Sequence, residues 1–184
     1  MNKKLPLYKN KRILTSFFGI FIISIMVFSV LNVYQSRDKT KEIEYNGYKF
    51  YENNGYWVTN INGQQLTFRY NPLELSNISL LNYNVYDKIY LSYNPKHFDE
   101  ERFVLGESLS LFKYVNIKPI LSCYEEKDCP DIPLVDCDNY NSILLKYNEN
   151  KTNIYIENKC LILEGSTEEQ IKYVYKITYN LLGI

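Results

Sequence analysis

The feature that most constrains the fold of this chain is a run of 22 residues without a charged side chain, from Ile13 to Tyr34. A helix of this length spans about 33 Å, enough to cross a hydrocarbon core of about 30 Å. The run exceeds the apolar core of a cleavable signal peptide, usually about 7–15 residues, and no small-x-small cleavage site follows it. We therefore predict that residues 13–34 form an uncleaved, single-pass transmembrane signal-anchor within the lipid bilayer.

The charges on the two sides of this run differ in sign. Residues 1–12 contain five basic residues and no acid, so this tail carries +5. Residues 35–184 contain the other 16 basic residues and all 21 acidic residues, so they carry −5. Positively charged flanks stay in the cytoplasm. We therefore expect a single-pass protein of the cell membrane, with a cytoplasmic tail at 1–12 and the C-terminal part outside the cell. The acidic C-terminal part also argues against a nucleic-acid partner, which requires a basic face.

The pattern after the anchor predicts a stalk followed by one domain. Residues 35–44 are polar with mixed charge and predict a short stalk, and residues 45–184 predict an exported α+β domain. Short runs rich in aromatic and β-branched residues, separated by Asn-Gly turn signals, predict the first strands. Further strands are expected on either side of a long helical pattern. The predicted strands of this part are 48–51, 56–61, 66–70, 85–93 and 117–123.

Two main helices are expected, at about 98–115 and 167–182. The first has Asp99, Glu100 and Glu101 in its first turn, where the helix dipole favours acids. The second follows a capping box that begins at Ser166, and Gly183 is suited to end it. Strand, helix and strand in succession predict a parallel pair inside a mixed sheet. A proline at position 119 would place the second of these strands at an edge.

The last three predicted strands suggest how the four cysteines pair. Runs at 142–147, 153–157 and 160–163 predict an antiparallel meander, whose first hairpin would place Ser142 opposite Glu157. Cys137 and Cys160 would then lie together, leaving Cys123 and Cys129 to close a small loop. An even number of cysteines in an exported domain favours two disulfides. A zinc site and redox-active thiols are alternatives, but the spacing contains no CxxC pair.

The remaining motifs do not define an active site. Residues 125–138 include six acids and one lysine, which fits either a solvated loop or a Ca²⁺ site, although the glycine and distal glutamate of an EF-hand loop are missing. His97 is the only histidine, and no GxSxG, HExxH or phosphate-binding glycine motif occurs. We therefore predict no catalytic, cofactor-binding or metal-ligating residue. Asn77 and Asn150 lie in N-x-S/T sequons and are possible glycosylation sites.

Three segments together resemble a group of uncharacterised archaeal proteins, small and single-pass, with an exported cysteine-containing domain. The segments are GYWVTNINGQQLTFRYNPLELSNI (55–78), CYEEKDCPDIPLVDCDNYNSILLKY (123–147) and NKCLILEGSTEEQIKYVYKITYNLLGI (158–184). The resemblance implies a membrane-anchored α+β domain. It implies no activity and no site residues.

These observations support three hypotheses for function. The first is a non-enzymatic domain outside the membrane, with a protein-interaction or structural role and an envelope or membrane protein as partner. The second is a metal-dependent enzyme, or an enzyme subunit, that uses the acidic loop 125–138. The third is an accessory subunit of a membrane complex, in which the single helix packs against others.

Overall fold

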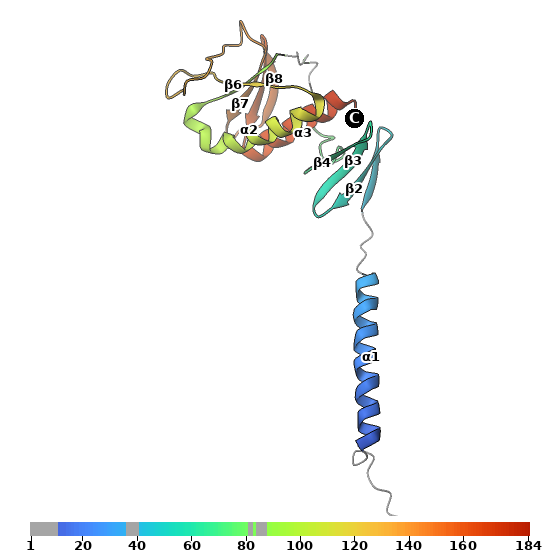
Figure 1. Ribbon diagram of the computed structural model, residues 1–184. Coiled ribbons are helices and arrows are strands. Elements are labelled where there is room, and N and C mark those ends of the chain that lie inside the picture. Colours follow the sequence, from blue (N-terminus) through green and yellow to red (C-terminus); the bar gives the residue numbers. More distant parts are fainter. Residues whose placement is uncertain (1–10, 36–40, 81–82, 84–87) are drawn as a thin grey trace, which may run out of the picture. The chain divides into compact units, whose positions relative to one another are not determined.

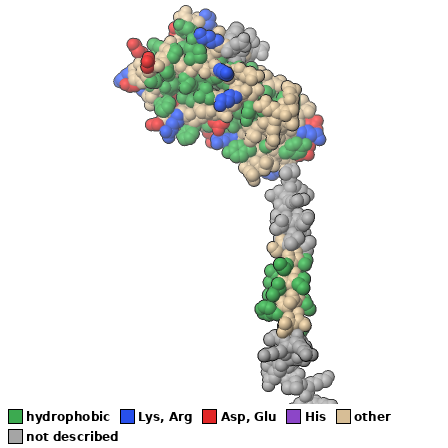
Figure 2. Space-filling model, viewed as in Figure 1, with side chains coloured by type: hydrophobic (Ala, Val, Ile, Leu, Met, Phe, Trp, Pro, Cys, Tyr) green, Lys and Arg blue, Asp and Glu red, His purple; other side chains and the backbone are tan. Residues whose placement is uncertain are grey.

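The computed structural model describes residues 11–35, 41–80, 83 and 88–184, and in the first helix it describes the side chains of residues 15–29. The chain separates into two units, Met1–Lys41 and Glu42–Ile184. The first unit contains α1 (Lys11–Gln35), whose described side chains are mostly hydrophobic and exposed (Figures 1 and 2). Within the described residues, no helix reaches the length and hydropathy of a membrane span. Residues 1–10 of the predicted tail and 36–40 of the predicted stalk lie outside the description.

The second unit begins with an antiparallel sheet in which every strand pairs with its neighbour in the chain. Its strands are β1 (Glu42–Tyr45), β2 (Tyr48–Asn53), β3 (Tyr56–Ile61) and β4 (Gln64–Phe68), in that spatial order. Each of the three connections is an Asn-Gly pair with positive φ at both residues, for example 52° at Asn62 and 81° at Gly63. Such turns match the twist of two adjacent strands. The predicted stalk was wrong at its end, because residues 42–44 belong to β1.

A five-stranded mixed sheet forms the other part of this unit. Its strands are β5 (Tyr90–Tyr93), β6 (Ile120–Cys123), β7 (Ser142–Tyr147), β8 (Asn153–Glu157) and β9 (Cys160–Gly165), in the order β6-β5-β7-β9-β8. The strands β6, β5, β7 and β9 are parallel, and β8 is antiparallel to β9. The predicted parallel pair around the first helix is thus confirmed as β5 and β6. As expected from the proline before it, β6 lies at an edge.

The predicted meander was wrong. β7 pairs with β9 rather than β8, and Ser142 lies opposite Cys160. The physical reason is burial: all six residues of β9 are buried, and the first four of β7 are as well. Strands buried on both faces occupy the centre of a parallel sheet, whereas β8 is half exposed and lies at the edge. The predicted strand 85–93 is shorter, since β5 begins at Tyr90, and its residues 85–87 lie outside the description.

The two predicted main helices are present as α2 (Phe98–Phe112) and α3 (Thr167–Leu182). A short 3₁₀ helix, η2 (Pro95–His97), leads into α2, and a second, η3 (Lys113–Val115), follows it. The Ser166 hydroxyl accepts a hydrogen bond from the Glu169 N–H at 3.5 Å, and Gly183 ends α3 with a φ of 77°. Both signals were predicted from the sequence. In Figure 1 the two helices lie beside each other along the mixed sheet.

One hydrophobic cluster contains residues of both sheets and of α3, and a smaller cluster of Leu144, Cys160 and Ile162 lies apart from it. The last turns of α3 pack against the antiparallel sheet: the Tyr179 ring lies 4.6 Å from that of Phe68 and 5.9 Å from that of Phe50, measured between ring centroids. Its first turns follow β9 directly and bury Ile171 and Val174 in the larger cluster. The unit is therefore α+β, as predicted, but with two sheets in place of one.

Candidate functional site

All four cysteines are paired. Cys123 is bonded to Cys129 and Cys137 to Cys160, the two pairs favoured by the sequence, and no free cysteine remains among them. The longer bridge joins the segment before β7 to the first residue of β9. The Lys159 N–H also donates to the Cys137 carbonyl at 2.9 Å. These bonds attach the irregular segment 124–140 to the mixed sheet at two places.

The acids of residues 125–138 make separate local contacts. The Asp136 carboxylate accepts from the Asn139 side chain and backbone, and these hydrogen bonds lower its pKa. Asp138 accepts from the Asn158 amide, and Glu125 accepts from the Asn94 amide at 2.8 Å. In the described part of the chain, which includes this whole loop, no three His, Cys, Asp or Glu side chains are grouped closely enough to hold a metal ion.

His97, Asn77 and Asn150 belong to different segments of the fold. His97 ends η2, and its ring lies 5.4 Å from that of Tyr147. Asn77 and Asn150, the sequon asparagines, are both exposed. The Asn150 N–H donates to the Asn148 side chain at 3.0 Å, which folds that loop into a tight turn. The structure therefore brings the cysteines together in pairs, whereas for His97 the contact found among the described residues is with the Tyr147 ring.

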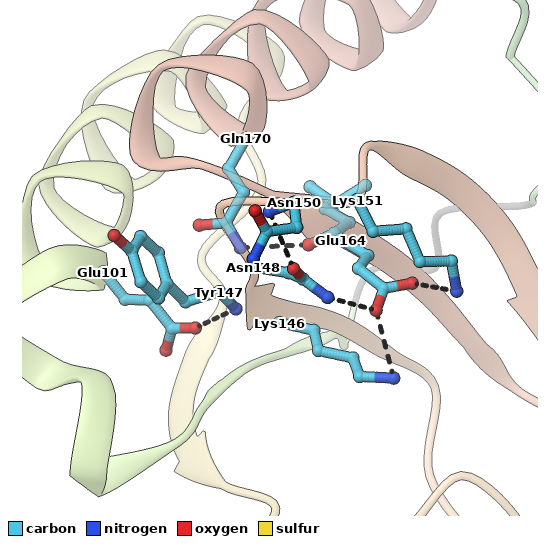
Figure 3. A network of polar contacts seen from close by, with 9 residues as sticks. Glu101, Lys146, Tyr147, Asn148, Asn150, Lys151, Glu164 and Gln170 are labelled. Carbon is cyan, nitrogen blue, oxygen red and sulfur yellow. Dashed lines mark hydrogen bonds and ion pairs between the residues drawn. The ribbon is translucent and has the colours of Figure 1, made fainter.

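A buried carboxyl group joins the carboxyl ends of two parallel strands. Glu101 of α2 is fully buried and accepts hydrogen bonds from the backbone N–H groups of Asn94 at 3.1 Å and Tyr147 at 2.8 Å. Figure 3 shows the bond to Tyr147. Burial raises the pKa of Glu101 to about 8, although both N–H groups favour the ionised form. Because these N–H groups follow β5 and end β7, Glu101 fixes α2 to the sheet. Its carboxyl group therefore has a structural role in this contact.

A second polar network lies at the ends of β7 and β9 (Figure 3). The buried Glu164 carboxylate pairs with Lys151 at 2.8 Å and Lys146 at 3.4 Å, and it accepts from the Asn148 amide at 3.2 Å. The hydrogen bond from Lys151 is the main cause that lowers the pKa of Glu164, while burial opposes it. The cluster ties the loop between β7 and β8 to β9. Both lysines stay about half exposed, so this network stabilises the loop at the surface.

One feature of the Glu42–Ile184 unit that offers room for a ligand is a groove of about 810 Å³. It lies along an exposed stripe of α2, next to the first turns of α3 and the two residues that follow β4. On α2 the stripe repeats at helical spacing, so one side of that helix lines the groove. The lining residues are Arg69, Tyr70, Arg102, Phe103, Gly106, Glu107, Ser110, Thr167, Glu168 and Ile171.

The middle of the α2 stripe is hollow because Gly106 has no side chain. A Cβ atom added there would meet nothing within 4 Å, and Ser110 one turn further is small and exposed. Beside it, 61% of the Phe103 surface is exposed, which is unusual for a large apolar side chain on a folded domain. The face of this unit seen in Figure 2 shows hydrophobic side chains between interspersed acidic and basic ones. The groove thus combines apolar surface, open space and charge.

Comparisons with protein-family models, with curated proteins and with solved structures give no match for this chain. The fold and the groove define the class of this unit: a disulfide-bonded α+β domain with a surface groove. The resemblance to archaeal membrane-anchored proteins stays a prediction.

Neither the burial of Glu101 nor the groove was predicted from the sequence. Glu101 was expected to interact with the helix dipole, whereas position 101 lies on the same helix side as Val104, Leu105 and Ser108, which are buried. That apolar spacing was the available signal. The groove has no comparable signal, because Arg69 and the α2 stripe are more than 30 residues apart in the chain.

Proposed function

We propose that the Glu42–Ile184 unit is a non-enzymatic binding domain, held to a membrane by residues 13–34, which docks a partner protein in the groove along α2. The observation that carries the proposal is the groove itself, with an exposed Phe103 beside the open space at Gly106. Interfaces are enriched in aromatic residues and arginine. Exposed aromatic side chains next to a hollow are typical of the pockets where binding energy concentrates.

The proposed location rests on two independent supports. Disulfides form in oxidising compartments and are rare in the cytoplasm, and all four cysteines of this unit are paired. The sequence adds an uncharged run of 22 residues preceded by five positive charges. Together they favour an N-terminus in the cytoplasm and the folded unit outside, where an envelope or membrane protein is the partner.

A site-specific crosslinking experiment tests the docking function. A photoreactive amino acid replaces Ser110 in the groove, and in a matched control it replaces Asn180, an exposed residue of α3 that does not line the groove. Full-length protein is irradiated in cells and purified in mild detergent. We expect a discrete adduct from position 110 and none from position 180.

The variant Gly106→Leu supplies the second control. Its side chain enters open space, and leucine favours a helix more than glycine does, so the fold should be retained while the groove is filled. The adduct at position 110 should disappear in this background. Equal adducts at both positions, or an adduct that Gly106→Leu leaves unchanged, would refute docking in this groove.

A further inference from the structure

The exposed face of α2 carries a central stripe with one charged residue on each side of it. On a helix with 3.6 residues per turn, positions 103, 106 and 110 fall within about 60° of one another, and all three are exposed. Positions 102 and 107 lie about 40° beyond the two sides of this stripe. The stripe therefore separates the Arg102 guanidinium group on one flank from the Glu107 carboxylate on the other.

The stripe is complementary to itself in shape. The Phe103 ring is largely exposed, and one turn further a Cβ atom added at Gly106 would meet nothing within 4 Å. When two helices pack side by side in the same direction, each central side chain of one enters a hole formed by four residues of the other. For Phe103 that hole lies between positions 99, 102, 103 and 106 of the second helix. Because Gly106 has no side chain, the hole has room for the ring.

The charges on the two flanks are complementary in the same arrangement. With Phe103 and Gly106 at the a and d positions of a heptad, Arg102 occupies the preceding g position and Glu107 the following e position. Side chains at g and e form the ion pairs between two helices that run in the same direction. Arg102 of each copy would therefore meet Glu107 of the other.

The ion pairs within one unit leave these two charges able to exchange partners. Arg102 lies 3.8 Å from Asp99, and both side chains are at least half exposed. Glu107 lies 4.0 Å from Arg69 and accepts from the Tyr175 hydroxyl at 3.1 Å. Ion pairs between exposed groups contribute little to stability, and a carboxylate has about four sites for donors. Glu107 can therefore accept from a second copy while it keeps the bond from Tyr175.

The lining of the groove contains equal numbers of opposite charges, Arg69 and Arg102 against Glu107 and Glu168. This balance favours neither an anionic nor a cationic partner. It does suit an identical chain, because in a two-fold pair the same patch is presented from both sides. The Glu107 flank of α2 lies toward α3, whose Tyr175 donates to it. Arg102 of a second copy would therefore enter the groove on this side.

From this geometry we infer that the partner docked in the groove is a second copy of this chain, with the two α2 helices packed in the same direction about a two-fold axis. This inference rests on the proposed docking function and names its partner. Phe103 of each copy packs beside Gly106 of the other, and Arg102 of each pairs with Glu107 of the other. The contact contains one aromatic layer, and small interfaces of this kind are transient, so the dimer dissociates on dilution.

The test measures the mass of the full-length chain in detergent micelles by light scattering over a range of concentrations. We expect dimers that dissociate on dilution. Arg102→Glu and Glu107→Arg should each raise the dissociation constant about tenfold, because each places like charges opposite one another. The two variants should associate again when mixed, since one then carries only acids at these positions and the other only bases. The matched control Lys118→Glu changes an exposed charge away from the groove and should dimerise like the wild type.

The variant Gly106→Leu tests the same contact without a change of charge. Its side chain fills the hole for Phe103 while the helix is retained, so association should be lost. Dimers that persist in this variant and in both charge variants would place the contact elsewhere and overturn the inference. Charge variants that stay monomeric when mixed, although circular dichroism shows both folded, would overturn the ion pairs and with them the inference.

The crosslink from position 110 separates the inference from the proposed function. If the partner is a second copy, the adduct has twice the mass of the chain and also forms in the purified protein. An adduct with a different protein, from a chain that is monomeric at every concentration, would overturn the inference and leave groove docking intact. A monomeric chain that gives no adduct in cells would count against both.

Discussion

The two sheets of the Glu42–Ile184 unit are built from contacts of different range. In the antiparallel sheet each strand pairs with the next strand of the chain through a two-residue turn. In the mixed sheet, β5 pairs with β7, which lies about 50 residues later in the chain. β7 pairs with β9, although β8 lies between them in the sequence and at the edge of the sheet. Both disulfides begin or end on strands of the mixed sheet, which also contains the buried Glu164, and Glu101 of α2 bonds to backbone N–H groups at the ends of β5 and β7.

The comparison shows that long-range pairing in this protein is accompanied by covalent and polar cross-links. Closing a long loop costs chain entropy before any contact is gained. A disulfide lowers that cost by restricting the unfolded chain, and the buried Glu101 carboxyl group accepts from two backbone N–H groups where parallel strands end. The antiparallel sheet has local turns and an aromatic contact with α3. Substitutions that remove a cross-link should therefore lower the free energy of unfolding more than substitutions in a local turn.

The largest expected effect comes from removing the longer disulfide. Replacing Cys137 and Cys160 together with serine should lower the free energy of unfolding by about 2–5 kcal/mol, since this bridge closes the longer loop. Replacing Cys123 and Cys129 should cost less, because only 6 positions separate them against 23. Urea unfolding of the full chain in detergent measures both. A larger loss from the short bridge would contradict this order.

The disulfide pairs were predicted correctly even though the strand pairing used to derive them was wrong. The predicted hairpin placed Glu157 next to the start of β7, whereas the structure places Cys160 opposite both Ser142 and Glu157. Either arrangement brings the segment before β7 to Cys160. The prediction of the cysteine pairs therefore did not depend on the correct strand order.

Features of the fold that depend on residues close together in the chain could be predicted from the sequence, and features that depend on distant residues could not. Asn-Gly turns, the cap at Ser166 and the helix spacing are local, and each was visible in the sequence. The order β7-β9-β8 depends on which strand is buried on both faces, which only the continuous apolar runs of β7 and β9 indicate. The groove depends on Arg69 and Tyr70, which follow β4, lying beside α2, and no local sequence pattern indicates that long-range proximity.

The second expected effect concerns Glu101. Its pKa is raised from 4.5 to about 8, so the folded state binds the proton more strongly than the unfolded state does. Its contribution to stability is full below about pH 4.5 and declines as the pH rises toward 8. Glu101→Gln leaves one buried N–H without an acceptor and should cost about 1–3 kcal/mol at pH 5. The loss should shrink toward pH 8.

Urea unfolding at several pH values measures this difference. Glu100→Gln is the control. It keeps the Glu101 carboxyl group and its bonds to the strand ends, and it removes only a neighbouring charge that raises the pKa of Glu101, so its pH dependence should persist and end at a somewhat lower pH. Between pH 4.5 and 8, the wild-type protein and this control should lose stability with rising pH relative to Glu101→Gln. Parallel pH profiles for all three proteins would show that Glu101 does not titrate in this range.

The smallest effect is expected in a turn of the antiparallel sheet. Gly63 has a φ of 81°, a conformation that costs a residue with a Cβ atom about 1 kcal/mol. Gly63→Ala should therefore lower the free energy of unfolding by this amount. The matched variant Gly106→Ala lies in a helix with open space around it and should stabilise the protein slightly. Thermal unfolding compares the two, and a loss in Gly63→Ala as large as that from the longer disulfide would remove the contrast between the sheets.

The central proposal, that the folded unit lies outside the cell and the N-terminal tail inside, is tested most directly by labelling lysines. Intact cells are treated with a membrane-impermeant amine reagent, and the modified lysines are mapped by mass spectrometry. The account predicts labels on exposed lysines of the folded unit, such as Lys49, Lys118 and Lys159, and none on Lys3, Lys4, Lys9 or Lys11 until the cells are lysed. Labels on those N-terminal lysines in intact cells, or labels on the folded unit only after lysis, would contradict it.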